Sequence, residues 1–134
     1  MLQGRFMDIG NTIQKGLGVR NGKLAELSKK PNCVSSQTTH DSKKVKPFKY
    51  NGDLKEQMSK VQKAISEMSG VEVKQNSDNY LYAVFTTKIM RFKDDVEVYL
   101  DDESKILHFR SASRVGYSDL GVNRKRYEAF VSKL

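Results

Sequence analysis

The chain has 134 residues, 37% of them hydrophobic, and a formal net charge of +8. Its length fits one domain with a modest core, because single cores commonly close at about 100–150 residues. The sequence has no run of roughly 20 apolar residues, and Arg5, Asp8 and Lys15 interrupt the apolar N-terminus, which excludes a membrane span and a signal peptide. We therefore expect a cytoplasmic protein with no membrane partner.

The basic surplus belongs to the N-terminal third of the chain. Residues 1–49 hold ten basic and three acidic residues, a surplus of seven, whereas residues 50–134 hold fourteen and thirteen, a surplus of one. The lysines at positions 43, 44, 46 and 49 lie in a stretch rich in Ser, Thr and Gln, which is typical of a solvated loop. Only Phe48 and Tyr50 are near enough in sequence to stack on bases. Nucleic acid is therefore not the expected partner.

Residues 1–30 differ in composition from the rest of the chain. They contain five of the nine glycines, which disfavour long regular structure. Phe6, Ile9, Ile13 and Leu17 nevertheless recur at the spacing of a short amphipathic helix. We expect a poorly ordered or docking extension over residues 1–30 and a single α+β domain over residues 31–134.

Cys33 is the lone cysteine, so the chain forms no internal disulfide, and no Cys/His cluster with zinc spacing accompanies it. A cysteine nucleophile with His40 as its base is a weaker interpretation than a buried structural cysteine. No third residue that would orient the histidine can be identified, and free cysteines are among the most often buried residues. We expect no metal and no cofactor.

A helix is predicted over residues 54–69. Asp53 can cap its first turn with Glu56 three residues on, and Gly70 can end it. Pro47 to Tyr50 could add a short strand before it. The apolar residues that form one stripe at helical spacing are Leu54, Met58, Val61, Ile65 and Met68.

Four strands are predicted after this helix, over residues 71–75, 80–87, 96–100 and 106–113, because alternating or β-branched stretches are separated there by turn residues. Asp119 can cap a last helix in which one face carries Tyr127, Phe130, Val131 and Leu134. The order β-α-β-β-β-β-α predicts an α+β fold, an antiparallel sheet of four to five strands with two helices on one face. A TATA-binding-like half-domain has this order. The second face of the sheet is expected to stay open.

The register of the last hairpin can be predicted from side-chain parity. Setting Leu100 opposite Leu107 places Val98 against Phe109 on the apolar face and Glu97 against Arg110 on the other face. A slip of one residue would set Glu97 against Phe109 and lose both the burial and the charge pairing.

Charges of opposite sign are concentrated in two blocks. Six acidic residues and no basic residue lie between Asp94 and Glu103, and six basic residues and one acidic residue lie between Lys105 and Arg126. Hairpin pairing brings the blocks together, so much of this charge is expected to form internal ion pairs. Arg124 and Arg126 fall in the first turns of the last helix, where the helix dipole disfavours cations, so an acidic residue or a bound anion should lie nearby. We expect Arg114 and Arg124 to reach toward the acidic strand.

Three stretches together resemble the family called domain of unknown function 1499, which occurs in bacteria and plastids: PNCVSSQ from Pro31, RFKDDVE from Arg91 and RSASRVGYSDLGVNRKR from Arg110. The resemblance covers roughly residues 17–134 and implies no established activity. The motif positions that we take as candidate binding residues are Arg91, Asp94, Asp95, Glu97, Arg110, Ser113, Arg114, Tyr117, Asp119, Asn123, Arg124 and Arg126. The secondary motif comprises Asn32, Cys33, Ser35 and Ser36.

Three functions fit these residues. The first is a binding module that recognises an anionic small molecule or an acidic protein partner, because the arginine fork suits bidentate anion recognition and no nucleophile lies beside a base. The second is a hydrolase- or lyase-type enzyme that uses Asp95 and Glu97 with Arg110 and Arg114. The third is weak, non-specific binding of nucleic acid through the basic N-terminal third.

Overall fold

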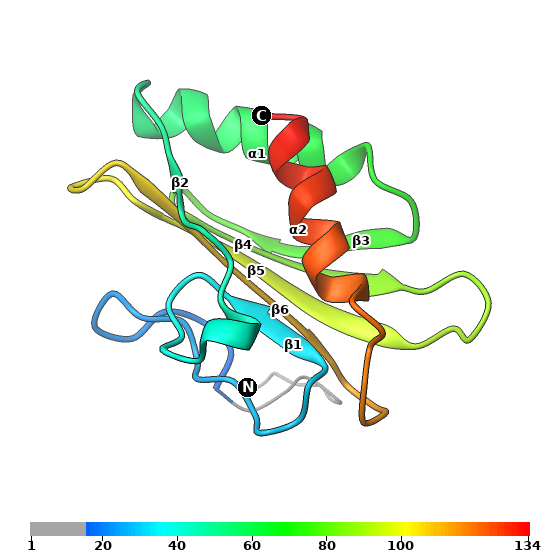
Figure 1. Cartoon of the computed structure of the whole chain (residues 1–134). Helices are drawn as coiled ribbons and strands as arrows, with labels where there is room; N and C mark the ends of the chain where they lie inside the picture. The colour runs from blue at the N-terminus through cyan, green and yellow to red at the C-terminus, as the bar shows by residue number, and fades with distance from the viewer. Residues whose placement is uncertain (1–15) are drawn as a thin grey trace, which may run out of the picture.

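The computed structural model of the protein describes residues 16–134 (Figure 1). Phe6, Ile9 and Ile13 of the expected N-terminal helix lie outside these residues, and Leu17 is in a loop. The elements in chain order are β1 (Cys33–Ser35), the 3-10 helix η1 (Asp41–Lys43), β2 (Phe48–Lys49), α1 (Leu54–Ser66), β3 (Val71–Asn76), β4 (Tyr80–Thr86), β5 (Lys93–Asp101), β6 (Ile106–Ser113) and α2 (Val122–Ser132).

The predicted fold class is confirmed: two α-helices lie on one face of an antiparallel sheet (Figure 1). The sheet has six strands rather than four or five, because β1 was not predicted. A strand of three residues offers no alternation that a sequence pattern could reveal. Its extended state comes from pairing with β6, where Cys33 lies opposite Ala112 and Ser35 opposite Arg110.

The strand order is β1-β6-β5-β4-β3, and β2 also pairs with β6. The predicted register of the β5–β6 hairpin is confirmed, with Val98 opposite Phe109 and Glu97 opposite Arg110. Because successive side chains of a strand point to opposite faces, Asp94 lies on the helix face and Asp95 on the other.

Helix α1 begins at its predicted cap, whereas α2 begins later than predicted. The Asp53 carboxylate accepts the N–H of Glu56 at 2.7 Å, and α1 ends at Ser66, three residues before the predicted end. Gly70 follows with φ 77°, and a Cβ there would lie 2.5 Å from the carbonyl oxygen of Thr86, so the close approach of β4 requires glycine. The last helix begins at Val122, after Gly121, rather than near Asp119.

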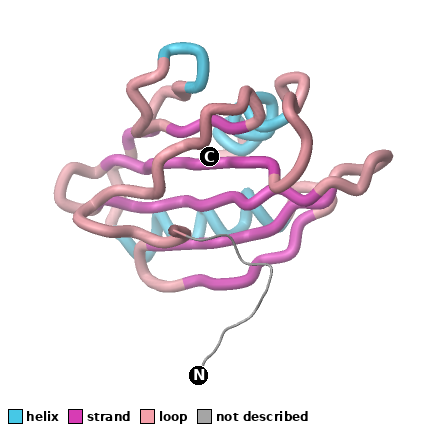
Figure 2. Tube along the Cα trace, turned by 90° about the horizontal axis from the view of Figure 1, so that it is seen from below, coloured by secondary structure: helices cyan, strands magenta, loops and turns pink. Residues whose placement is uncertain are grey.

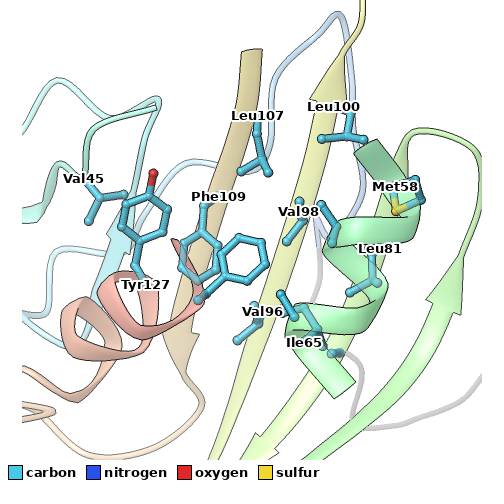
Figure 3. Packing of buried hydrophobic residues seen from close by; sticks show 14 of the residues in the cluster. Val45, Met58, Ile65, Leu81, Val96, Val98, Leu100, Leu107, Phe109 and Tyr127 are labelled. Atoms are coloured by element: carbon cyan, nitrogen blue, oxygen red, sulfur yellow. The ribbon is translucent and has the colours of Figure 1, made fainter. Parts of the chain in front are cut away.

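The main core lies between the helices and the sheet. Met58 and Ile65 of α1 pack over Leu81 and the neighbouring strand β5 (Figure 3). Tyr127 of α2 packs against Phe109, with ring centroids 4.7 Å apart. The two apolar helix stripes therefore share one sheet face, which fixes the position of the N-terminus of α2 over β5 and β6.

The face of the sheet opposite the helices is covered, which corrects the expectation of an open face. Residues 16–30, called the N-terminal segment below, cross it as a loop (Figure 2). Leu24 of this segment packs with Tyr80, Tyr82 and Val84 of β4 in a second, smaller cluster. Aromatic and aliphatic side chains thus occupy this face of β4, and burying them favours a covered face. None of the described helices is long and apolar enough to cross a bilayer.

Candidate functional site

Two connections meet at the end of the sheet opposite the β5–β6 hairpin (Figure 1). The first loop, residues 87–92, joins β4 to β5, and the second loop, residues 114–121, joins β6 to α2. Arg91 and Leu120 hold positive φ values of 59° and 53° in these loops. Such a backbone is uncommon for residues other than glycine and persists only where neighbouring contacts hold it. Hydrogen bonds from Arg91 N to Thr87 O and from Phe92 N to the Thr87 hydroxyl, at 3.1 and 2.9 Å, hold the first loop.

The two loops enclose a cleft of about 330 Å³, called the apolar cleft below. Of the eight large hydrophobic side chains that are exposed among residues 16–134, seven lie in these loops or at the first residue of α2. Such a concentration is typical of an interaction site, whereas single exposed hydrophobic residues are ordinary. The cleft is lined by Ile89, Met90, Phe92, Val115, Leu120 and Val122, with Lys88, Asp94, Ser113, Ser118 and Asp119 among its polar residues.

A buried polar network centred on Asn123 lies behind this cleft. The fully buried Asn123 Nδ2 lies 3.0 Å from both Asn32 O and the Ser113 hydroxyl and 2.7 Å from the Asp119 carboxylate, so its two N–H groups are shared among three acceptors. Its Oδ1 accepts from the Ser111 hydroxyl and, at 2.7 Å, from Arg126 Nη1. One side chain therefore joins the residue before β1, strand β6, the second loop and α2. Asp119 also accepts the backbone N–H groups of Gly121 and Asn123, so it stabilises the start of α2. It is not the cap that the sequence predicted, because the N-cap is Gly121, two residues later.

Asp94 connects this network to the cleft. Its carboxylate is 1% exposed and lines the cleft, and its Oδ2 lies 2.7 Å from Arg126 Nη2. Its Oδ1 has no hydrogen-bond partner among the described residues. Arg126, rather than Arg124, thus pairs with the acidic strand. Arg124 instead donates to the carbonyl oxygen of Ser42 at 2.9 Å, which corrects the prediction that it would approach the acidic residues.

A second cavity adjoins the apolar cleft on the helix side. This basic groove, of about 610 Å³, shares Thr87, Lys88 and Val122 with the cleft and is also lined by Arg91, Lys125 and Arg126. Among residues 16–134, Lys88, Arg91 and Lys125 are exposed and have no acidic partner within 4.0 Å. Arg126 forms one wall, with its guanidinium 4.7 Å from the centre of the Phe85 ring.

The remaining predicted charges lie on the opposite face and are internally paired. Arg114 holds Asp95 through two hydrogen bonds, of 3.0 and 2.9 Å, and Tyr82 donates to the same carboxylate at 2.5 Å. The hydrogen bond to Asp95 and the charge of that residue raise the pKa of Arg114. Asp95 is fully buried. This cluster is a buried ion pair in which both oxygens of the acid accept hydrogen bonds.

Glu97 and Arg110 connect the sheet to the N-terminal segment. Glu97 Oε2 accepts from the Tyr80 hydroxyl and Gly18 N at 2.6 and 2.7 Å, while Arg110 donates to the carbonyl oxygens of Ala25 and Glu26 at 2.9 and 3.2 Å. The two charges are 3.6 Å apart. Burial raises the pKa of Glu97, and the Tyr80, Gly18 and Arg110 contacts offset that effect only in part.

The secondary motif has a structural role in this fold. Asn32, Cys33, Ser35 and Ser36 are all buried. Asn32 Nδ2 donates to Gly116 O at 2.9 Å, which fixes the second loop, and the Ser36 hydroxyl accepts the N–H of Phe109 at 3.0 Å. Cys33 Sγ lies 3.5 Å from Lys30 O. No group of three or more metal-binding side chains occurs among the described residues.

A family model described as "Protein of unknown function (DUF1499)" matches residues 23–134. The chain belongs to the DUF1499 family. The resemblance drawn from the three motifs is therefore confirmed. No curated protein matches the chain.

The DUF1499 motif residues separate into two groups in the structure. Asp94, Ser113 and Asp119 line the cleft, Arg91 and Arg126 line the groove, and the buried Asn123 joins Ser113, Asp119 and Arg126. Tyr117 is 73% exposed and lines neither cavity. Asp95, Glu97, Arg110 and Arg114 instead pair across the other face. Sequence reasoning did not select the groove lysines Lys88 and Lys125, or Ile89 and Leu120. A signal was present in Thr87–Phe92, a stretch with two bases, three large hydrophobic residues and no acid between two strands.

Proposed function

We propose that the protein is a binding module that recognises an anionic group in the basic groove. The observation that supports this most directly is the groove formed by Lys88, Arg91 and Lys125, three exposed bases that have no acidic partner within 4.0 Å in the described part of the chain. Bases that converge on one cavity without counter-charges favour an anionic ligand. The ligand is an anionic small molecule or an acidic segment of a protein partner.

In this proposal the anion binds beside the arginines that are paired with acids, and those arginines stabilise the fold without contacting the ligand. Arg110, Arg114 and Arg126 each have an acid within 4.0 Å and little exposed surface. An anion would have to compete with a buried carboxylate for each of them. Arg126 still shapes the groove, because its pair with Asp94 fixes the guanidinium against Phe85.

The experiment is a titration of ¹⁵N-labelled protein with inorganic phosphate, followed by amide chemical shifts. We expect the largest shifts at residues 88, 91 and 125. Lys125→Gln and Lys88→Gln should each weaken binding about two- to fivefold, the effect of 0.5–1 kcal/mol for an exposed charge contact. Lys60→Gln, an exposed lysine on α1 outside the groove, is the matched control. Equal weakening by Lys60→Gln, or no shift in the first loop, would contradict the proposal.

The enzyme hypothesis receives no such support. Asp95 and Glu97 are fully buried, and their contacts are with Arg114, Tyr82, Tyr80, Arg110 and the N-terminal segment. A general base must lie within hydrogen-bond distance of the substrate proton, and a substrate cannot approach these two buried acids that closely. Nucleic-acid binding through the basic N-terminal third has no comparable cavity behind it among the described residues: Lys44, Lys46 and Lys49 are exposed, but Lys43 is buried and donates to Ser28 O.

A further inference from the structure

The apolar cleft combines hydrophobic walls with a polar floor. Ile89 is 89% exposed and Leu120 87% exposed, on opposite loops, while Asp94 on the floor is 1% exposed. Ligand sites in proteins are typically apolar cavities of roughly 300–1,000 Å³ with a few polar groups that orient the ligand. At about 330 Å³, the cleft has the size of a site for a small molecule.

The floor of the cleft specifies which polar group a ligand would carry. Asp94 Oδ1 is buried and has no hydrogen-bond partner among the described residues, while Oδ2 lies against Arg126. Leaving a buried carboxylate oxygen without a donor is costly, so a donor supplied by a ligand would be stabilised there. The carboxylates that line the cleft, Asp94 and Asp119, are offset by Lys88 of the lining and by Arg126, which pairs with Asp94 at 2.7 Å. The preference for a cation therefore comes from Asp94 Oδ1 itself, because a carboxylate oxygen binds a charged donor more strongly than a neutral one and repels an anion.

We propose that the apolar cleft is a second binding site, for a small molecule with an aliphatic or aromatic body and a terminal primary ammonium group. The body lies between the first loop and the second loop, and the ammonium donates to Asp94 Oδ1. This site shares Thr87, Lys88 and Val122 with the basic groove but differs from it in its apolar walls and in the buried Asp94 carboxylate. Its test uses an amine, which the bases of the groove do not attract, so the two proposals can fail separately.

Three probes of equal chain length test the proposal: hexylamine, 1-hexanol and hexanoate, each titrated into the ¹⁵N-labelled protein. We expect hexylamine to shift the amides of residues 87–94 and 113–122 and to bind most tightly, 1-hexanol to bind more weakly, and hexanoate to bind least. Equal affinity for all three would mean a non-specific apolar patch and would overturn the proposal. Preference for hexanoate would overturn it as well.

Variants locate the binding. Leu120→Ser and Ile89→Ser should each weaken hexylamine binding by up to about tenfold, because each removes an apolar contact worth about 1–1.5 kcal/mol. Val73→Ser is the control, an exposed valine on β3 outside the cleft, and should leave the affinity unchanged. Asp94→Asn should remove the preference for hexylamine over 1-hexanol. Because that substitution also weakens the pair with Arg126, the two exposed substitutions keep the test independent of folding. Unchanged affinity in Leu120→Ser and Ile89→Ser would refute the assignment.

Discussion

Replacing Asn123 with alanine should destabilise the protein more than any surface substitution. The change removes an amide group with five polar contacts, three of which share its two N–H donors, that join Asn32 beside β1, β6, the second loop and α2. Some of the partners keep another contact: Asn32 O still accepts from Ser113 N, and Arg126 still donates to the Ser111 hydroxyl at 3.1 Å. At about 0.5–1.5 kcal/mol per bond, with part of the network retained, we expect a loss of about 3–5 kcal/mol.

The assay is urea denaturation followed by far-UV circular dichroism, because the chain contains no tryptophan. A loss of this size in a chain of 134 residues corresponds to a fall in melting temperature of roughly 10–20 °C. Glu128→Ala, an exposed residue of the same helix, is the control and should change stability by less than about 0.5 kcal/mol.

Asn123→Asp separates hydrogen bonding from packing. The aspartate side chain has nearly the same shape as asparagine, but one of its carboxylate oxygens would face Asn32 O, the Ser113 hydroxyl and Asp119 in place of the N–H donors. We expect it to cost at least as much as alanine. If either variant loses less than about 1 kcal/mol, the network does not hold the loop and helix as described.

Three further outcomes follow from the charged residues. Arg114→Ala leaves Asp95 buried without its cation and should cost about 3–5 kcal/mol in urea denaturation, and a loss below 1 kcal/mol would show that the pair is not needed. Asp119→Ala should cost about 1–2 kcal/mol, because three N–H donors lose their acceptor, and an unchanged melting temperature would contradict this. The raised pKa of Glu97 means that the folded protein binds the proton of this carboxyl group more tightly than the unfolded chain does. The contribution of Glu97 to the free energy of unfolding is therefore complete below the ordinary glutamate pKa. It falls as the pH rises through the raised pKa of the folded state. The stability of Glu97→Gln relative to the wild type should therefore increase from pH 4 to pH 7, and a constant difference would refute the burial effect.

The sheet and its register could be predicted because local patterns agree with tertiary contacts. Alternation in Val96–Leu100 and opposite charges at Glu97 and Arg110 both select the observed register. Which arginine of α2 pairs with an acid depends on where the helix begins, because the first residue sets which side chains face the sheet. With the helix beginning at Val122, Arg126 lies near Asn123 and Tyr127 on the buried face, whereas Arg124 points away from it.

The site was only partly predictable. The motif residues Asp94, Ser113 and Asp119 do line one cavity, but its walls come from Ile89 and Leu120, which lie in loops that only the folded sheet brings together. The cover over the second face was missed for a similar reason. Glycines at 16, 18 and 22 suppress any periodic signal in a segment whose order comes from contacts with the sheet.

The N-terminal segment also determines how far the chain can be truncated without exposing the second sheet face. A polypeptide trimmed to the family-matched residues 23–134 would lose Leu17, Gly18 and Val19. Glu97 would then keep Tyr80 but lose a backbone donor, and the tyrosines of β4 would become accessible to water or to another molecule. Expression of such a fragment should yield a protein that self-associates more readily than the full chain. Limited proteolysis within residues 16–30 should likewise expose the side chains of β4 that this segment covers.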